Sequence, residues 1–129
     1  RCTSRGLGDV YKRQGVDSGF CKELGFDLLL VDGHTEKMAL PMVEYKGRSI
    51  LFTSDLVPTT GHIPVPYLMG YDVRPLVTME EKSQILKNCL ENETLLFLQH
   101  DPYNELVSLT NTDKGVRLEN SSSLNDFFS

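Results

Sequence analysis

Cysteine and tryptophan are scarce in this sequence, and their scarcity excludes several classes of protein. The 129 residues contain no tryptophan and only three cysteines, at positions 2, 21 and 89. The number is odd and no two cysteines form a CxxC pair, so neither a disulfide framework nor a thiolate zinc site is indicated. We therefore expect a protein of a reducing compartment, the cytoplasm.

Positive charge and long apolar runs are also in short supply. The 13 Lys and Arg residues are outnumbered by 18 Asp and Glu, which gives a net charge of −5. Because binding to phosphate groups requires clustered basic side chains, nucleic acid and membrane surfaces are poor candidates as partners. The densest apolar run, residues 28–31, is far shorter than the ~18 residues of a membrane span. The length and the remaining composition suit one globular domain.

Residues 1–14 differ from the rest of the chain. They hold four basic residues, one acidic residue and no apolar periodicity, and they resemble the translated adapter sequence of truncated environmental reading frames. We expect this segment to be an artefact without ordered structure and exclude it from fold reasoning, although a flexible basic arm is the alternative. Without it, nine basic and 17 acidic residues remain, a net charge of −8.

The apolar pattern predicts a layered α/β or α+β domain. Gly47 marks a hairpin turn, and residues 56–78, which hold four prolines, are expected to form an extended loop. Thr78 and Glu81 have the spacing of a capping box that would begin a helix of about three turns. A second, short helix is expected at residues 123–128. Strands are expected at residues 26–31, 38–45, 49–53, 94–98, 106–110 and 116–118.

Three side chains that can bind metals each follow a predicted strand: His34, Asp55 and His100. Rigid strands can bring residues that are far apart in the sequence to one point, where ligands then bind. Imidazole nitrogen and carboxylate oxygen are ligands of zinc, manganese and iron. Other interpretations stay open from the residues alone: a hydrogen-bonded loop histidine, an aspartate that caps the next turn, or a polar pair between His100 and Asp101.

The sequence around these three positions resembles the C-terminal half of the metallo-β-lactamase superfamily. The similarity lies in Gly-His-Thr at residues 33–35, Leu-Phe-Thr-Ser-Asp-Leu at residues 51–56 and His-Asp at residues 100–101. Further motifs are similar to the subgroup of general metallo-hydrolases, akin to lactonases and organophosphate hydrolases; they lie at residues 61–66, 70–72, 81–82 and 114–117. The resemblance covers about residues 16–119.

The resemblance implies half of an αββα sandwich, a mixed sheet with helices on one face, and a dinuclear centre of divalent metals, expected to be zinc. By this similarity His34 is a terminal ligand of the first metal and His100 is a terminal ligand of the second. Asp55 matches the carboxylate that bridges both metals, which makes it the catalytic residue of the set. The metal pair would activate water against an ester, lactone or phosphoester bond of a small-molecule substrate.

His62 and Tyr71 lie in the loop that follows Asp55 and are candidates for the wall of a substrate pocket. The alternative is ordinary loop packing by an aromatic ring and a hydrogen-bonded histidine. Three apolar residues of the same loop, at positions 67–69, suit either a pocket wall or the interface of a homodimer.

The sequence departs from the superfamily pattern in two places. The leading motif His-x-His-x-Asp-His is absent, and the usual Gly-His-Thr-Pro-Gly has Glu36 and Lys37 at its end. We therefore expect a domain truncated at its N-terminus, with residues 15–129 as its C-terminal part and no activity on its own. Because half of a sandwich leaves one apolar sheet face uncovered, we also expect aggregation. The alternative is a binding or scaffold domain that keeps the fold without metals.

Overall fold

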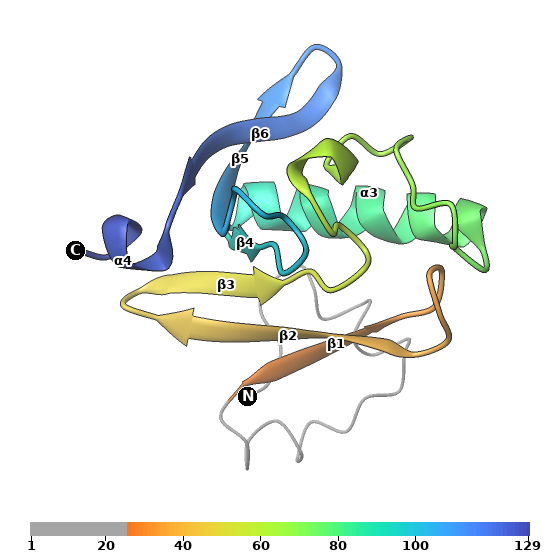
Figure 1. Ribbon diagram of the computed structural model, residues 1–129, viewed down its shortest axis with the longest axis horizontal. Coiled ribbons are helices and arrows are strands. Elements are labelled where there is room, and N and C mark those ends of the chain that lie inside the picture. The colour runs from red at the N-terminus through yellow and green to blue at the C-terminus, as the bar shows by residue number, and fades with distance from the viewer. Residues whose placement is uncertain (1–25) are drawn as a thin grey trace.

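The structure is a computed structural model that describes residues 26–129, so the adapter-like segment 1–14 lies outside the described part. The described residues form one six-stranded mixed sheet in the order β1-β2-β3-β4-β5-β6 (Figure 1). The strands are β1 (Asp27–Val31), β2 (Met38–Tyr45), β3 (Arg48–Phe52), β4 (Leu95–Phe97), β5 (Leu106–Thr112) and β6 (Gly115–Ser122). The helices are the 3-10 helix η1 (Thr60–His62), α3 (Pro75–Glu91) and α4 (Leu124–Phe127).

Three strands run in the same direction and end at the same edge of the sheet. β1 and β3 are both antiparallel to β2, and β4 is parallel to β3. The carboxyl ends of β1, β3 and β4 therefore point toward the same edge of the sheet, although β2 lies between β1 and β3 and β1 extends beyond the end of β3. The parallel connection from β3 to β4 contains α3, as expected for a crossover between parallel strands.

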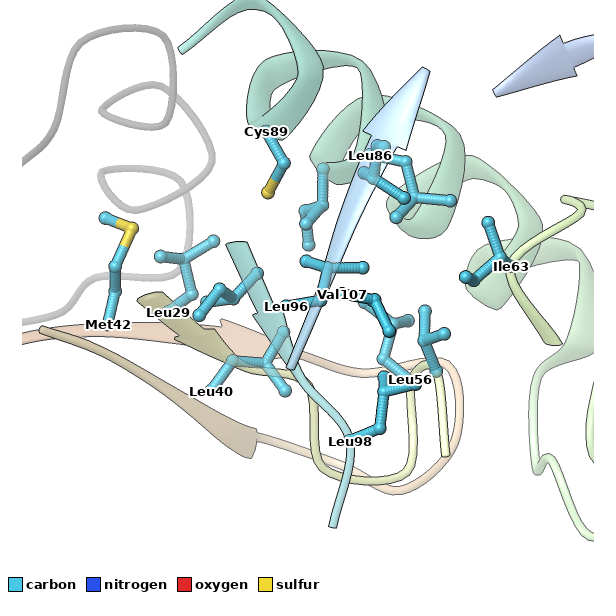
Figure 2. Close-up of a cluster of buried hydrophobic side chains, with 14 of the residues drawn as sticks. Leu29, Leu40, Met42, Leu56, Ile63, Leu86, Cys89, Leu96, Leu98 and Val107 are labelled. Carbon is cyan, nitrogen blue, oxygen red and sulfur yellow. The ribbon is translucent and has the colours of Figure 1, made fainter. Parts of the chain in front are cut away.

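The main core lies between α3 and one face of the sheet (Figure 2). Because side chains alternate along a strand, every second apolar residue points to this face, and Leu51 and Leu96 of the central strands are fully buried. α3 contributes Ile85, Leu86 and Cys89, each no more than 1% exposed. The mixed α+β architecture predicted from the sequence is confirmed.

The opposite face of the sheet carries a second, smaller apolar cluster. Its buried members are Ile50, Leu95 and Leu106. Phe52 and Phe97 cover them only in part, and their ring centroids are 4.9 Å apart. Leu124 and Phe128, within and beside α4, pack against the same cluster. This face therefore stays partly open over Phe52 and Phe97.

The predicted strands are all present, and the β2–β3 turn has the expected chemistry. Lys46 and Gly47 have φ angles of 48° and 81°, as in the two-residue turn that matches the twist of a hairpin.

Within residues 26–129, no helix combines the length and hydropathy needed to span a membrane.

The predicted start of the long helix is wrong. α3 begins at Pro75, three residues before Thr78, because proline suits the first helical turn, where its missing N–H has no partner to lose. Thr78 does not cap the helix; its hydroxyl donates to the carbonyl of Arg74. Glu81 also bonds elsewhere, to the turn after β1. The loop before α3 is not wholly extended either, since it holds the short helix η1.

Candidate metal centre

His34, Asp55 and His100 come together at the edge where β1, β3 and β4 end. Each is the third residue after the last residue of its strand. The Nε2 atom of His34 is 3.3 Å from Oδ2 of Asp55, and the Nε2 atom of His100 is 2.8 Å from Oδ1 of Asp55. Asp55 thus directs a different carboxylate oxygen toward each imidazole.

The cluster becomes more exposed from His34 toward His100. The side chain of His34 is 12% exposed, that of Asp55 is 31% exposed and that of His100 is 53% exposed. The buried end is therefore His34, and a molecule from solvent would reach the cluster on the side of His100.

The turn that carries His34 is attached to α3 by Glu81. The two carboxylate oxygens of Glu81 accept hydrogen bonds from the backbone N–H groups of Asp32 and Gly33, at 2.8 and 2.9 Å. Gly33 is required there because a Cβ would collide with the backbone of Thr78. Desolvation raises the pKa of Glu81, and the two backbone hydrogen bonds partly offset that rise.

The same turn is also bonded to the segment that leads into α3. Arg74 N–H donates to the carbonyl of Gly33 at 2.8 Å, and Val73 N–H donates to the carbonyl of His34 at 3.1 Å. Lys37 has a φ of 54°, so this lysine takes the left-handed conformation that favours glycine. The departure from Pro-Gly at residues 36–37 therefore does not prevent a left-handed turn beside His34.

Asp72 lies on the other side of the His34 ring. Its Oδ1 atom is 2.7 Å from Nδ1 of His34, and its side chain is only 2% exposed. His34 consequently has a carboxylate at each ring nitrogen, with Asp72 at Nδ1 and Asp55 at Nε2.

Asp55 is held by the turn that follows β3. Ser54 has a φ of 47°, an uncommon backbone conformation for a residue with a side chain, and its hydroxyl donates to the carbonyl of Ala39. Thr53 is 1% exposed, and its hydroxyl donates to the carbonyl of Val57 at 2.7 Å. The first contact joins the turn to β2, and the second joins the residues on either side of Asp55.

Asp101 secures the loop next to His100. Its carboxylate accepts hydrogen bonds from the N–H groups of Thr60, Tyr103 and Asn104 at 2.9, 3.0 and 3.0 Å. Although desolvation raises the pKa of Asp101, these bonds outweigh it and lower the pKa to about 2. Asp101 is therefore a structural anion that joins the His100 loop to η1.

Three solved structures share this architecture. They are a probable metal-dependent hydrolase from Staphylococcus aureus, 19% identical with a TM-score of 0.64; AidC, a dizinc quorum-quenching lactonase in complex with a product N-hexnoyl-L-homoserine, 17% identical with a TM-score of 0.66; and AbOPH, a hydrolase in the beta lactamase superfamily, 20% identical with a TM-score of 0.66. The matches cover 77–79% of this chain. The described chain contains part of the metallo-β-lactamase fold.

The chain spans little more than a third of these hydrolases, since the matches cover 35–37% of their length. No family model matches the sequence, and no curated protein matches it either. The likeness to metallo-β-lactamase structures therefore shows the fold, at identities of 17–20%.

The three predicted ligands supply too few donors to enclose a metal ion. Among residues 26–129, no group of three or more His, Cys, Asp or Glu side chains is arranged to hold one. On each side of Asp55 there is one imidazole, so each side offers two protein donors at most. Imidazole and carboxylate are donor types that bind zinc, but a zinc site needs more donors than either side of Asp55 offers in this part of the chain.

In the described part of the chain, neither His62 nor Tyr71 forms a hydrogen bond or an ion pair with His34, Asp55 or His100. Nδ1 of His62 lies 2.9 Å from the hydroxyl of Thr59, and Tyr71 is 85% exposed. Burial and the nearby Lys82 ammonium lower the pKa of His62. A cavity of about 390 Å³ lies beside the His100 loop, along residues 97–105, and neither His62 nor Tyr71 lines it. Their place in a substrate pocket stays a prediction.

Lys82 belongs to the motif at residues 81–82, but its burial was not predicted from the sequence. It is fully buried, and its ammonium donates to the carbonyls of His62, Pro64 and Tyr67. Burial lowers its pKa to about 8. Its position three residues before Ile85, on the apolar face of α3, was the signal that could have identified a buried lysine.

Proposed function

We propose that this chain contributes one half of the metal centre of a metallo-β-lactamase-fold hydrolase. The observation that carries the proposal is the carboxylate of Asp55, whose two oxygens face two different imidazoles. A carboxylate in that position can bridge two cations and offset their repulsion, while His34 and His100 each serve one of them. Two divalent metals, zinc by preference, would be held in this way.

The centre would supply a hydrolytic nucleophile. When bound, such a metal pair lowers the pKa of water and polarises the oxygen of an ester, lactone or phosphoester. In this chain, Glu81 holds the turn that carries His34, and Asp101 holds the loop that carries His100. These residues would position the metal ligands and would not contact the substrate. His62 and Tyr71 remain candidates for contact with a small-molecule substrate.

The remaining ligands must come from outside the described residues, because each metal position has only two protein donors here. We propose that a segment with the motif His-x-His-x-Asp-His supplies them. The chain alone would then bind metal weakly and would not hydrolyse substrate. The share of the solved hydrolases that it covers, 35–37%, supports this division.

A binding or scaffold domain without metals is the second candidate. The observation that favours it is that His34 and His100 each already contact the carboxylate of Asp55. Such a cluster could hold three loops together as a hydrogen-bonded unit, without any ion.

Equilibrium dialysis against zinc separates the two candidates. We expect the chain to bind zinc and Asp55→Asn to lose that binding, because the substitution removes the anionic charge between the two imidazoles. Asp113→Asn is the matched control, since Asp113 is an exposed residue in the turn between β5 and β6. Equal zinc binding by the wild type and Asp55→Asn, or none by either, would favour the scaffold domain.

A further inference from the structure

We infer that residues 62–67 form a binding site for a primary ammonium ion, and that the side chain of Lys82 fills this site from within the chain. Lys82 is thereby a positioning residue, which holds the loop before α3 against the helix. The ammonium site stands on the geometry of the described chain. Its consequence for His62 as a substrate contact rests on the proposed function.

The ammonium site consists of three backbone carbonyl oxygens that converge on one nitrogen. Nζ of Lys82 lies 2.7 Å from the carbonyl oxygen of Tyr67, 2.9 Å from that of His62 and 3.3 Å from that of Pro64. An ammonium group has three N–H donors and no acceptor, so three carbonyls match its full donor capacity. Because Lys82 is fully buried, these oxygens replace the water that its charge would otherwise need.

The sequence of the loop explains why its carbonyls need a donor from another segment. Residues 62–67 are His-Ile-Pro-Val-Pro-Tyr, and the two prolines have no backbone N–H. The loop therefore has more carbonyl acceptors than N–H donors, and a carbonyl that is withdrawn from water without a partner is costly. The Pro64 carbonyl accepts from Tyr67 N–H at 3.0 Å as well as from Lys82, so the ammonium also supports this turn.

Lys82 and the core hold the loop in different ways. The side chain of Ile63 is 1% exposed and packs in the main core (Figure 2). The ammonium of Lys82 holds the backbone on both sides of it, at His62 and at Pro64. Because the His62 carbonyl is bonded in this way, Lys82 would set the place of His62 in a substrate pocket.

Amide hydrogen exchange at pH 7 tests the role of Lys82 without any metal. We expect Lys82→Met, which keeps an apolar stem but removes the donors, to lower the protection of the Ile63 and Tyr67 N–H groups about 10–100-fold relative to the amides of β5. Lys87→Met is the matched control, since Lys87 is exposed on the same helix, and it should leave both groups unchanged. An equal loss in loop and strand, or no loss in the loop, would overturn the inference.

Chemical rescue tests whether the site binds a cation. Lys82→Ala removes three carbons and the nitrogen, which propylammonium replaces. We expect propylammonium at pH 7 to restore the protection of the loop in Lys82→Ala with a saturable dose dependence, and to leave the wild type unchanged. The control is 1-propanol, which has a similar size but one O–H donor and no charge, and it should restore less. No rescue by propylammonium, or equal rescue by 1-propanol, would overturn the ammonium site.

The two measurements separate this inference from the proposed function. Exchange and rescue need neither zinc nor substrate, so a chain that binds no zinc would refute the metal centre while the loop amides still decide the role of Lys82. Circular dichroism shows whether each variant is folded. Where Lys82→Ala does not fold, the comparison of Lys82→Met with Lys87→Met decides by itself: a loss confined to the loop supports the inference, and any other result overturns it.

Discussion

Glu81 links the metal-binding turn to the helix that covers the sheet. Its carboxylate accepts two backbone hydrogen bonds from the turn of His34. The neighbouring Glu80 is exposed and does not make these bonds. The loss of these acceptors would leave two part-buried N–H groups without their partners. The position of His34 thus depends on a residue that is 47 positions away in the sequence.

We therefore expect Glu81→Ala to lower the free energy of unfolding by about 1–3 kcal/mol. Urea denaturation monitored by circular dichroism measures this change. Glu80→Ala, on the same helix but exposed, should change the free energy of unfolding by less than about 0.5 kcal/mol. Equal effects of the two substitutions would show that the hydrogen bonds of Glu81 do not hold the turn.

Because Lys82 is buried, we expect the free energy of unfolding to change with pH in the alkaline range. Burial lowers its pKa in the folded chain from 10.5 to about 8. Between these two values the unfolded chain binds the extra proton, so the free energy of unfolding rises with pH. Below pH 8 both states carry the proton, and the cost of the buried charge is constant.

The expected result is a wild-type chain that gains stability on the order of 2 kcal/mol from pH 8 to pH 10, relative to Lys82→Met. Urea denaturation of both proteins at each pH gives the difference. The comparison cancels the titration of other groups, which both proteins share. A parallel pH dependence in the two proteins would mean that Lys82 keeps an ordinary pKa.

The strands show what the sequence can predict at the scale of elements. Apolar runs mark the strands because burial of alternating side chains is a local property of each segment. The convergence of His34, Asp55 and His100 was also predictable, since all three follow strands and their motifs resemble one superfamily. The structure adds that these strands are codirectional, which places the three residues at one edge.

Residues whose partners are distant could not be predicted in the same way. Asp72 contacts His34 across 38 positions, and Glu81 contacts the β1 turn across 48 and 49 positions. Such pairs depend on how the segment before α3 folds back onto the sheet, which no local pattern encodes. The capping-box prediction at Thr78 was wrong for the same reason, because tertiary contacts use Glu81 elsewhere.

At the scale of a single element, the conformation of the β2–β3 turn can be tested by substitution. Lys46 has a φ of 48°, which asparagine tolerates better than lysine, and Asn-Gly is the preferred pair for this turn. We expect Lys46→Asn to raise the free energy of unfolding by about 0.5–1 kcal/mol. Thermal denaturation at a matched low concentration measures it. Lys114→Asn, in an exposed turn position of the other hairpin, is the control, and a lower stability of Lys46→Asn would contradict the turn assignment.

At the scale of the whole molecule, the sheet has one well-covered face and one partly open face. α3 covers the main core, whereas Phe52 and Phe97 on the other face are only partly buried. An apolar sheet face of this kind promotes association between molecules. The open face is consistent with a chain that spans a little over a third of its structural neighbours.

We expect the purified chain to self-associate as its concentration rises, and Phe97→Thr to reduce this association. Light scattering over a range of concentrations measures both. Tyr103→Thr is the control, because Tyr103 is 91% exposed but lies in a loop rather than on the sheet. A monomer with a sharp, reversible thermal transition would contradict the expectation.

The convergence of two imidazoles on one carboxylate is tested most directly by histidine spectra during zinc titration. The chain has only three histidines, and His62 bonds to Thr59 instead of Asp55, so it is an internal control. We expect the ring nitrogen signals of His34 and His100 to shift together as zinc is added, those of His62 to stay in place, and Asp55→Asn to abolish the shifts. Signals of His34 and His100 that do not respond, or that respond no more than His62, would contradict a shared metal centre.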